Sequence, residues 1–569
     1  MPLQAVWLVL VGLGASAACV EQELQTASLE ATGGLGGAPA DPFDCATSVV
    51  GQLPAGEVFG EGQEPVDWLF ATGEYGVSEG PGISIVARDS FRLWVDGQLL
   101  VEGEAARAPV HLPLSLTPGD HVIAVSVVAE QGTPAARLHL DELERTTVSD
   151  ASWRVSSAPE ADWTAVGFDD SAWAAARELA PGGAWPGCDP TENFPVSSAA
   201  RWIGAEEIEG GPIALRGTVH IGPVGFAETT TGGAGAEPVL VSTWAELESL
   251  AVSTSPAIIV VPEGVHDFRP TGSEVVQQEV CPTECSNEPG KTRYEVLLSG
   301  ETCANTVVSL PRSDRILRFG SNKTLVGLGR GAALRGVSID FQASENIVVR
   351  NVAVYDVNPG MVEAGDALSF NEPRRVWVDH ATVRWISDGF ADFRAGSSAI
   401  TLSWVRFDGG NEQECGGIHS EVNNIGDSEV TIHHSLYDRI AMKGPRAVGE
   451  GSRVHLFDNV YTNVTSWAID SNCRATVLVE GSTFQSVEVI ARSSTCSDDT
   501  GAGYLDFPAG SNLYRDGNPV FGTTDGQEPH ATGFSPPYEY TVELANDVWP
   551  VVLSRAGAGG PWALPLALD

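Results

Sequence analysis

Three aspartates occupy related places before two short apolar segments in the C-terminal half of the chain. Asp366 lies ten residues before the segment at Val376, and Asp388 and Asp392 lie twelve and eight residues before the segment at Ile400. Carboxylates brought close together repel each other unless a divalent cation lies between them. Ligands that are all oxygens favour a hard cation, and Ca²⁺ over Mg²⁺ where the site is open and flexible. The alternative interpretation is a solvated charged face.

An imidazole and two cations follow at similar distances. His419 lies eleven residues before Val430, and Lys443 and Arg446 lie eleven and eight residues before Val454. If the segments stack, these positions stack as well, at about 4.8 Å per strand. The spacing therefore predicts one strip on one face that carries all six side chains.

The apolar segments themselves share a frame that predicts how they stack. Positions one and three of each are branched apolar residues or Leu, position eight is Val, Phe or Tyr, and the starts are 23 to 30 residues apart. Short strands repeated at this period are typical of a parallel β-helix, in which each coil buries its apolar face only against its neighbours. The segments begin at Ile347, Val376, Ile400, Val430, Val454 and Val477.

Five motifs stand out between residues 321 and 446. They are Ser-Asn-Lys-Thr-Leu-Val-Gly-Leu-Gly at 321–329, Gly-Asp-Ala-Leu at 365–368, Trp-Val-Asp-His at 377–380, Ser-Asp-Gly-Phe-Ala-Asp-Phe at 387–393 and Lys-Gly-Pro-Arg at 443–446. With these motifs, the chain from about residue 238 to residue 562 resembles the pectate lyase family of right-handed parallel β-helices. The resemblance implies cleavage of polygalacturonate, or a related acidic polysaccharide, by β-elimination. It also implies that Asp366, Asp388 and Asp392 hold Ca²⁺.

The same resemblance implies catalytic roles for two cations. Lys443 stands where the family has its base Arg, and Arg446 matches an Arg that binds or orients the substrate. As a base, Lys443 has to be neutral, and a nearby Ca²⁺ and Arg446 would favour the neutral amine. The alternative is that Lys443 only pairs with substrate charges.

Two departures from the family pattern put the activity in question. A second family Arg is Val448 here, and no Lys or Arg occurs between Arg406 and Arg439. His419 could compensate by donating a hydrogen bond to the substrate, or it could be structural. The competing hypothesis is therefore a non-catalytic surface carbohydrate-binding or adhesion protein derived from a lyase.

The N-terminus has the pattern of an export signal. Residues 5–18 form an apolar run too short to span a bilayer, and residues 16–19 read Ser-Ala-Ala-Cys. This ending resembles a bacterial lipoprotein cleavage site with Cys19 as the lipidated residue, and ordinary cleavage near Ala17 or Ala18 is the alternative. We expect a secreted protein or one anchored to the outer cell surface, whose sole membrane contact is that lipid.

Composition shifts divide the rest of the chain. Residues 20–41 are small and polar and predict a flexible tether. Residues 42–222 alternate like strands and resemble the galactose-binding-like β-sandwich modules of carbohydrate enzymes, with or without a ligand. Residues 223–237 are rich in Gly and Thr and predict a linker. The β-helix with a C-terminal tail is expected at 238–569.

Charge and cysteine content narrow the possible partners. The 569 residues carry a net charge of −43, which excludes nucleic acid as a partner because its phosphates would be repelled. Eight of the nine cysteines remain if Cys19 is set aside, and an even number suits disulfides in an oxidising compartment. Cys473 and Cys496 are about one coil apart and could bridge neighbouring coils, and Cys45 and Cys188 could bracket the first domain.

Residues 279–304 predict a loop on an early coil. We expect the protein to be a monomer.

Overall fold

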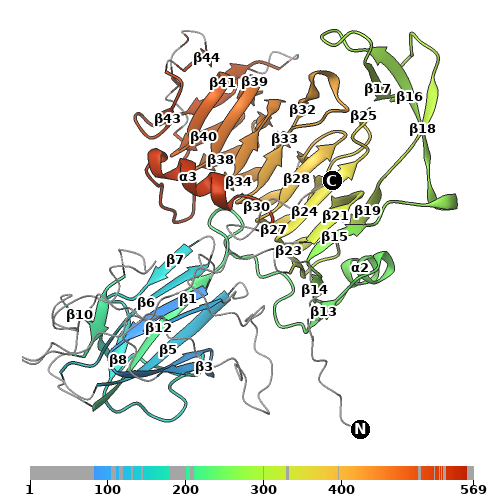
Figure 1. The fold of residues 1–569 in the computed structure, drawn as a ribbon. Coiled ribbons are helices and arrows are strands. Elements are labelled where there is room, and N and C mark those ends of the chain that lie inside the picture. The colour runs from blue at the N-terminus through green and yellow to red at the C-terminus, as the bar shows by residue number, and fades with distance from the viewer. Residues whose placement is uncertain are drawn as a thin grey trace, which may run out of the picture. The chain divides into compact units, whose positions relative to one another are not determined.

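The computed structural model describes residues 82–559, except for residues 104–109, 114–118, 130–131, 143–144, 180–199, 206–210, 299, 329–331, 395, 497–500, 518, 524–525, 527 and 530–532. Strands dominate this part of the chain (Figure 1). The predicted fold class, a right-handed parallel β-helix preceded in sequence by a β-sandwich domain, is confirmed. None of the described helices has the length and apolar character needed to cross a bilayer.

Two antiparallel sheets form the N-terminal domain. The first runs in the order β10-β11-β6-β1-β4 with β7 beside β6, and the second in the order β3-β2-β5-β12-β8-β9. Their facing side chains, among them Ile85, Leu93 and Val125, are almost completely buried. The strands are β1 (Gly82–Ala87), β2 (Ser90–Val95), β3 (Gln98–Gly103), β4 (Val110–Pro113), β5 (Gly119–Ala129), β6 (Ala135–Glu142), β7 (Arg145–Val148), β8 (Arg154–Ser156), β9 (Ala174–Ala175), β10 (Arg177–Leu179), β11 (Trp202–Gly204) and β12 (Gly211–Ile221).

A ten-stranded parallel sheet carries the sequence frame of the β-helix. Ile347 pairs with Val376, and Val376 with Ile400, so the first positions of successive segments lie in register as predicted. The strands are β13 (Pro238–Leu240), β14 (Ala257–Val261), β20 (Lys323–Gly327), β23 (Glu345–Arg350), β27 (Arg374–Asp379), β30 (Ser398–Ser403), β34 (Glu429–His433), β38 (Arg453–Phe457), β40 (Thr476–Glu480) and β42 (Tyr504–Asp506).

A sixteen-stranded sheet supplies the other two walls. The long strand β39 (Val460–Asn472) pairs with β35 near its start and with β37 near its end, so the sheet consists of two joined stacks. The outer stack contains β15 (Gly264–Asp267), β21 (Ala332–Arg335), β24 (Val352–Val357), β28 (Thr382–Ile386), β31 (Arg406–Asp408) and β35 (Leu436–Asp438). The site stack contains β19 (Arg315–Arg318), β22 (Val337–Asp340), β26 (Leu368–Asn371), β29 (Ala391–Arg394), β33 (Asn423–Gly426) and β37 (Arg446–Val448). Both stacks continue through β39 and β41 (Thr483–Ser494) to β43 (Leu513–Tyr514) and β44 (Phe521–Gly522).

Aromatic side chains stack from coil to coil inside the β-helix. The ring centroids of Phe341 and Phe370 are 4.7 Å apart, and those of Phe370 and Phe393 are 4.3 Å apart. Tyr437 and Tyr461, both at position eight of the sequence frame, stack at 4.7 Å. The phenylalanine rings belong to the coils of the site stack, whereas the two tyrosines belong to β35 and the start of β39 in the outer stack.

Residues 279–304 do not form the predicted loop. They belong to an antiparallel excursion made of β16 (Gln277–Glu284), β17 (Thr292–Val296) and β18 (Val308–Pro311), and β17 also pairs with β25 (Met361–Val362) (Figure 1). The repeat of apolar segments does not predict this excursion, because its strands lie outside the regular coils of the β-helix.

Three disulfides lie in the described part of the chain. The predicted Cys473–Cys496 bridge is present and joins the segments that follow β39 and β41. Cys281–Cys303 closes the excursion, and Cys285–Cys415 ties it to a turn of a later coil, the 3-10 helix η2 (Cys415–Gly417). Cys19, Cys45 and Cys188 lie outside the described residues.

Further segments close the ends and sides of the β-helix. Helix α2 (Trp244–Ala251) buries Leu247 in the main core, and α3 (Ala545–Arg555) packs Val548 and Val552 beside Trp404. Residues 223–237, expected to form a linker, hydrogen-bond to the ten-stranded sheet, where Gly232 N donates to Asn346 Oδ1 at 2.9 Å. The remaining elements are η1 (Gly272–Glu274), β32 (His419–Glu421) and β36 (Ile440–Met442).

The replacement Phe370→Ala tests whether the ring stack holds the coils together. Removing this fully buried ring should lower the free energy of unfolding by about 3–5 kcal/mol, measured by chemical denaturation. Val265→Ala, at a side chain that is half exposed, is the control and should change it little. An equal loss in both variants would show that the stack has no special role.

Candidate functional site

The polar side chains of the site come from turns that precede the site stack in successive coils. Asp366 precedes β26, Asp388 precedes β29, and Asp392 lies within β29. Neighbouring turns are bonded to each other: Ala367 N donates to Gly389 O at 2.9 Å, and Phe390 N to Val422 O at 2.7 Å. The coil register therefore brings the three predicted aspartates together.

Two glutamates lie beside these aspartates, although the strip predicted from the sequence does not include them. Glu363, Asp388 and Glu421 each offer a carboxylate oxygen within 4.8 Å of the other two. Glu421 lies nine residues before Val430, an offset between those of Asp388 and Asp392, so the same count could have identified it. We call Glu363, Asp366, Asp388, Asp392 and Glu421 the carboxylate cluster.

Asp366 and Asp392 form the deeper part of the cluster. Asp366 accepts a hydrogen bond from Ser369 Oγ at 2.8 Å and lies 3.6 Å from the Arg394 guanidinium. Asp392 accepts a hydrogen bond from Asn424 N at 3.0 Å. Both carboxylates lie against Gly389: a methyl group there would collide with Asp392 and lie 3.1 Å from Asp366 Oδ1. The glycine leaves room for both groups.

The carboxylates are too close and too buried to ionise independently. Burial raises the pKa of Asp388 to about 7, with further contributions from the charges of Asp366, Glu363 and Glu421. Burial also raises the pKa of Asp392 well above its ordinary value, and that of Asp366 in the same direction. A cation among them would remove this repulsion, and an all-oxygen donor set of carboxylates suits Ca²⁺. The residues present therefore fit a calcium ion.

Lys443 lies at the edge of the cluster. It follows β36, its side chain is 15% exposed, and its ammonium group forms an ion pair with the Glu421 carboxylate. Its positive charge also acts on Asp392, where it opposes the rise of the pKa. The amine and the carboxylates thus form one site with Glu421 as the shared group.

Arg446 lies on the same stack but outside the cluster. It is one-third exposed, and its Nε is 3.7 Å from Asp470 Oδ2 in the next coil. Val448 ends the same strand, so the second cation expected from the family pattern is absent from β37.

His419 occupies the strip but not its surface. It is 1% exposed and its ring stacks on Phe390 at 4.5 Å. Its Nδ1 lies 2.5 Å from Glu414 Oε1, and its Nε2 lies 2.8 Å from Asp388 O and 2.6 Å from Glu421 O. A substrate contact, the role expected from the sequence, would need an exposed ring nitrogen, and the position of His419 does not support that role.

The contacts of His419 give it a different function. Burial alone would lower its pKa, but the ion pair with Glu414 and the carbonyl acceptors outweigh burial and raise it. The protonated ring can donate from both nitrogens, so it clamps the main chain of Asp388 and Glu421 in place. His419 thus positions two members of the carboxylate cluster.

Comparison with known proteins matches this part of the chain to one family. Residues 298–500 match the family model described as pectate lyase. A probable pectin lyase E of Aspergillus niger is 28% identical over 275 residues, which cover 47% of this chain and 74% of that protein. A probable pectin lyase F of Emericella nidulans is 27% identical over 294 residues, which cover 49% and 61%.

Solved structures of pectate lyases are also similar. One from Bacillus sp. N165, in complex with trigalacturonate, has a TM-score of 0.40 and 20% identity, and the match covers 60% of this chain and 99% of that chain. One from Paenibacillus sp. 0602 has a TM-score of 0.44 and 16% identity, with 60% and 97% covered.

The replacement Gly389→Ala tests whether the glycine makes room for a metal. The methyl group should displace Asp392 and weaken Ca²⁺ binding about ten- to hundredfold, measured by titration calorimetry. Gly426→Ala, in the neighbouring strand β33, is the matched control, because its methyl group would meet only Phe393 O at 3.5 Å. Unchanged affinity in Gly389→Ala would place the ion elsewhere.

Metal-free protein should lose stability as the pH rises through about 7. The folded state holds a proton on Asp388 up to that pH and the unfolded state does not, so the proton favours folding only at lower pH. Added Ca²⁺ should therefore raise the melting temperature more at about pH 8 than at about pH 5.5. Asp388→Asn should reduce this pH dependence; if it leaves the dependence intact, another group is responsible.

Proposed function

From the pectate lyase family domain at residues 298–500, we propose that the protein is a lyase that cleaves a polyuronate by calcium-assisted β-elimination. The observation that carries the proposal is the contact between the Lys443 amine and a group of carboxylates suited to bind a cation. Lys443 is ion-paired with Glu421, which is at the same time within 4.8 Å of Glu363 and Asp388. A base and a group that polarises the substrate are the two components that this elimination requires.

The cluster has an outer and an inner layer that suit different tasks. Glu363, Asp388 and Glu421 are exposed or half-buried and would hold the ion where a substrate can reach it. Asp366 and Asp392 lie deeper and would complete its oxygen shell. A bound Ca²⁺ would neutralise the substrate carboxylate and stabilise the negative charge that develops when the adjacent C5 proton leaves.

Lys443 is the proposed base. Its amine would take the C5 proton, and the electron pair of the C5–H bond would form the C4–C5 double bond. The C4–O4 bond would break with its electron pair going to O4, which would then take a proton from water. For this step the amine has to be neutral, and its nitrogen is ion-paired with the Glu421 carboxylate. Glu421 is both the ion-pair partner of Lys443 and a candidate metal ligand. A cation bound to Glu421 would reduce the negative charge that Glu421 presents to Lys443. We therefore expect activity to rise towards alkaline pH.

The charge of the site favours an unesterified substrate. Five carboxylates would repel a free uronate, and only a cation between them can turn the repulsion into binding. A methyl-esterified uronate has no charge for that cation to neutralise. Although the sequence relatives are named pectin lyases, we propose pectate-like polymers as the substrate class.

Export to an oxidising compartment is part of the proposal. Three disulfides lie in the described part of the chain, and such bonds persist outside the cytoplasm. A polymeric substrate of this kind would be encountered there.

A non-catalytic carbohydrate-binding protein is the second candidate. Two observations favour it: the Lys443 amine is engaged in an ion pair with Glu421, and Val448 provides no cation in β37. Such a protein would still bind polyuronate through Ca²⁺ without cleaving it.

Incubation with polygalacturonate and Ca²⁺ separates the two candidates. A lyase generates unsaturated product that absorbs in the ultraviolet, and a chelator should abolish it. Lys443→Ala should lower the rate at least about 100-fold, the scale of a positioned general base. Lys291→Ala removes a lysine paired with Glu288 in the excursion and should leave the rate unchanged. Binding without product in the wild-type protein would establish the second candidate.

A further inference from the structure

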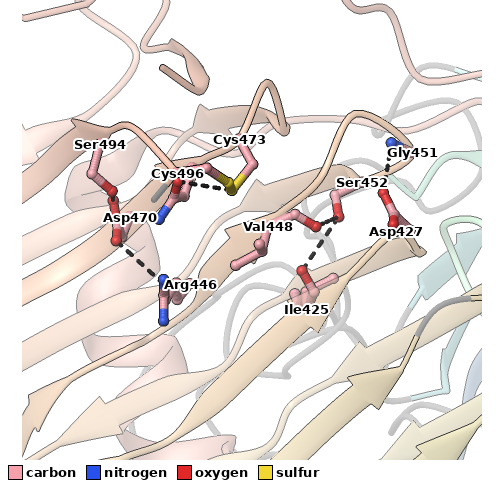
Figure 2. The surroundings of a disulfide bond; sticks show 11 residues. Ile425, Asp427, Arg446, Val448, Gly451, Ser452, Asp470, Cys473, Ser494 and Cys496 are labelled. Atoms are coloured by element: carbon pink, nitrogen blue, oxygen red, sulfur yellow. Dashed lines mark hydrogen bonds and ion pairs between the residues drawn. A yellow bond between two sulfur atoms is a disulfide. The ribbon is translucent and has the colours of Figure 1, made fainter. Parts of the chain in front are cut away.

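Two arginines and one aspartate form a column on the site stack beyond Lys443. Arg446 in β37 pairs in register with Asp470 in β39, and Asp470 with Arg492 in β41. The column continues the line of Asp392 and Asn424 from β29 and β33. It lies close to the Cys473–Cys496 disulfide, where Figure 2 shows Arg446 and Ser494 next to the Asp470 carboxylate.

Asp470 holds both arginines through one oxygen. Its side chain is fully buried, and Oδ2 lies 3.2 Å from Arg492 Nη2 and 3.7 Å from Arg446 Nε. Its Oδ1 accepts a hydrogen bond from Ser494 Oγ at 2.7 Å. The two guanidinium groups are therefore gathered around a single buried anion.

Arg492 is also fixed from its other side. Its guanidinium carbon lies 3.9 Å from the ring centroid of Trp467, which is 6% exposed. A cation over an indole face is attracted by the ring, and the planar contact limits the rotamers of the arginine. The group is thus oriented before any ligand arrives.

The column has more donors and more positive charge than the protein itself uses. Two guanidinium groups face one carboxylate, which leaves one positive charge in a chain whose net charge is −43. Among the described residues no acceptor hydrogen-bonds to the Arg446 side chain, and its buried Nε has the Asp470 carboxylate at ion-pair distance but no hydrogen-bond partner. Arg446 and Arg492 are nevertheless 34% and 38% exposed, so the rest of each guanidinium is accessible from solvent. An anionic ligand would use both features.

We infer that Arg446 and Arg492 together bind the carboxylate of a uronate residue distant from the one at the carboxylate cluster. This inference rests on the proposed substrate class. Four strand spacings of about 4.8 Å separate Asp392 from Arg492, roughly 19 Å in all. A polyuronate chain lying along the stack would reach both places, whereas a short oligomer would reach only one. Arg492 thereby supplies, two coils further on, a positive charge that β37 lacks at Val448.

The test compares binding of long oligogalacturonates and of digalacturonate in the presence of Ca²⁺. Titration calorimetry is done with the Lys443→Ala protein, so that no substrate is consumed. Arg492→Gln in that background should weaken binding of the long oligomers about ten- to hundredfold, as expected for lost charge-assisted hydrogen bonds, and should weaken digalacturonate binding much less. Arg492→Lys keeps the charge without the planar fork and should give an intermediate loss.

Arg474→Gln is the matched control. Arg474 lies just after β39 and is half exposed, but it pairs with Glu450 and not with the column. It removes the same charge from the same region, so its affinity for long oligomers should stay within about twofold of the parent. Equal losses in Arg474→Gln and Arg492→Gln would reduce the effect to general electrostatics and overturn the inference.

The outcome is independent of whether the protein is a lyase. If wild-type protein forms no unsaturated product but Arg492→Gln still loses long-oligomer affinity, the inference stands and the proposed catalysis fails. If the wild-type protein is active and both Arg492 variants, with unchanged melting temperatures, bind long oligomers normally, the column has a structural role only. In that case the inference fails and the proposed function stands.

Discussion

The register of the coils is the constraint on which the site depends. Branched apolar side chains and stacked rings, such as Phe370 on Phe393, are buried at equivalent places in every turn, and a shift by one residue would expose them. Hydrophobic burial therefore fixes the height of each turn. The polar groups in those turns have no choice of neighbour: Asp366, Asp388 and Asp392 meet because the core behind them is in register.

Bringing like charges together costs free energy, and the local structure around the carboxylate cluster reduces this cost. His419 holds two of the acidic turns through main-chain carbonyls, and Gly389 leaves the deeper carboxylates room. Lys443 balances one charge directly. What remains is a preformed arrangement of oxygens whose pKa values are raised by burial and, in addition, by mutual repulsion that a cation can remove. The fold and the metal affinity are in this sense linked.

Periodic features of the sequence predict most of the β-helix, whereas features that do not repeat from coil to coil cannot be predicted in this way. The spacing of buried positions gives the register from Ile347 onwards, and the coil-length separation of Cys473 and Cys496 gives their bridge. Glu363 is harder to find because it lies in a turn whose length varies from coil to coil. The burial of His419 is equally invisible, since offsets along the chain place a residue at a turn without saying whether its ring points into the core or out to solvent.

The Cys285–Cys415 bridge joins segments 130 residues apart, and Gly416 N donates a hydrogen bond to Glu288 Oε2 at 3.0 Å. Ordinary solenoids are modular, because each repeat touches only the repeats on either side. Here an early excursion is fastened to a late turn that leads directly into β32 and its His419. The coils between Cys285 and Cys415 are therefore closed by a covalent link. Adding or removing a coil between these two cysteines would displace the turn that carries His419, and with it the acidic turns that His419 contacts.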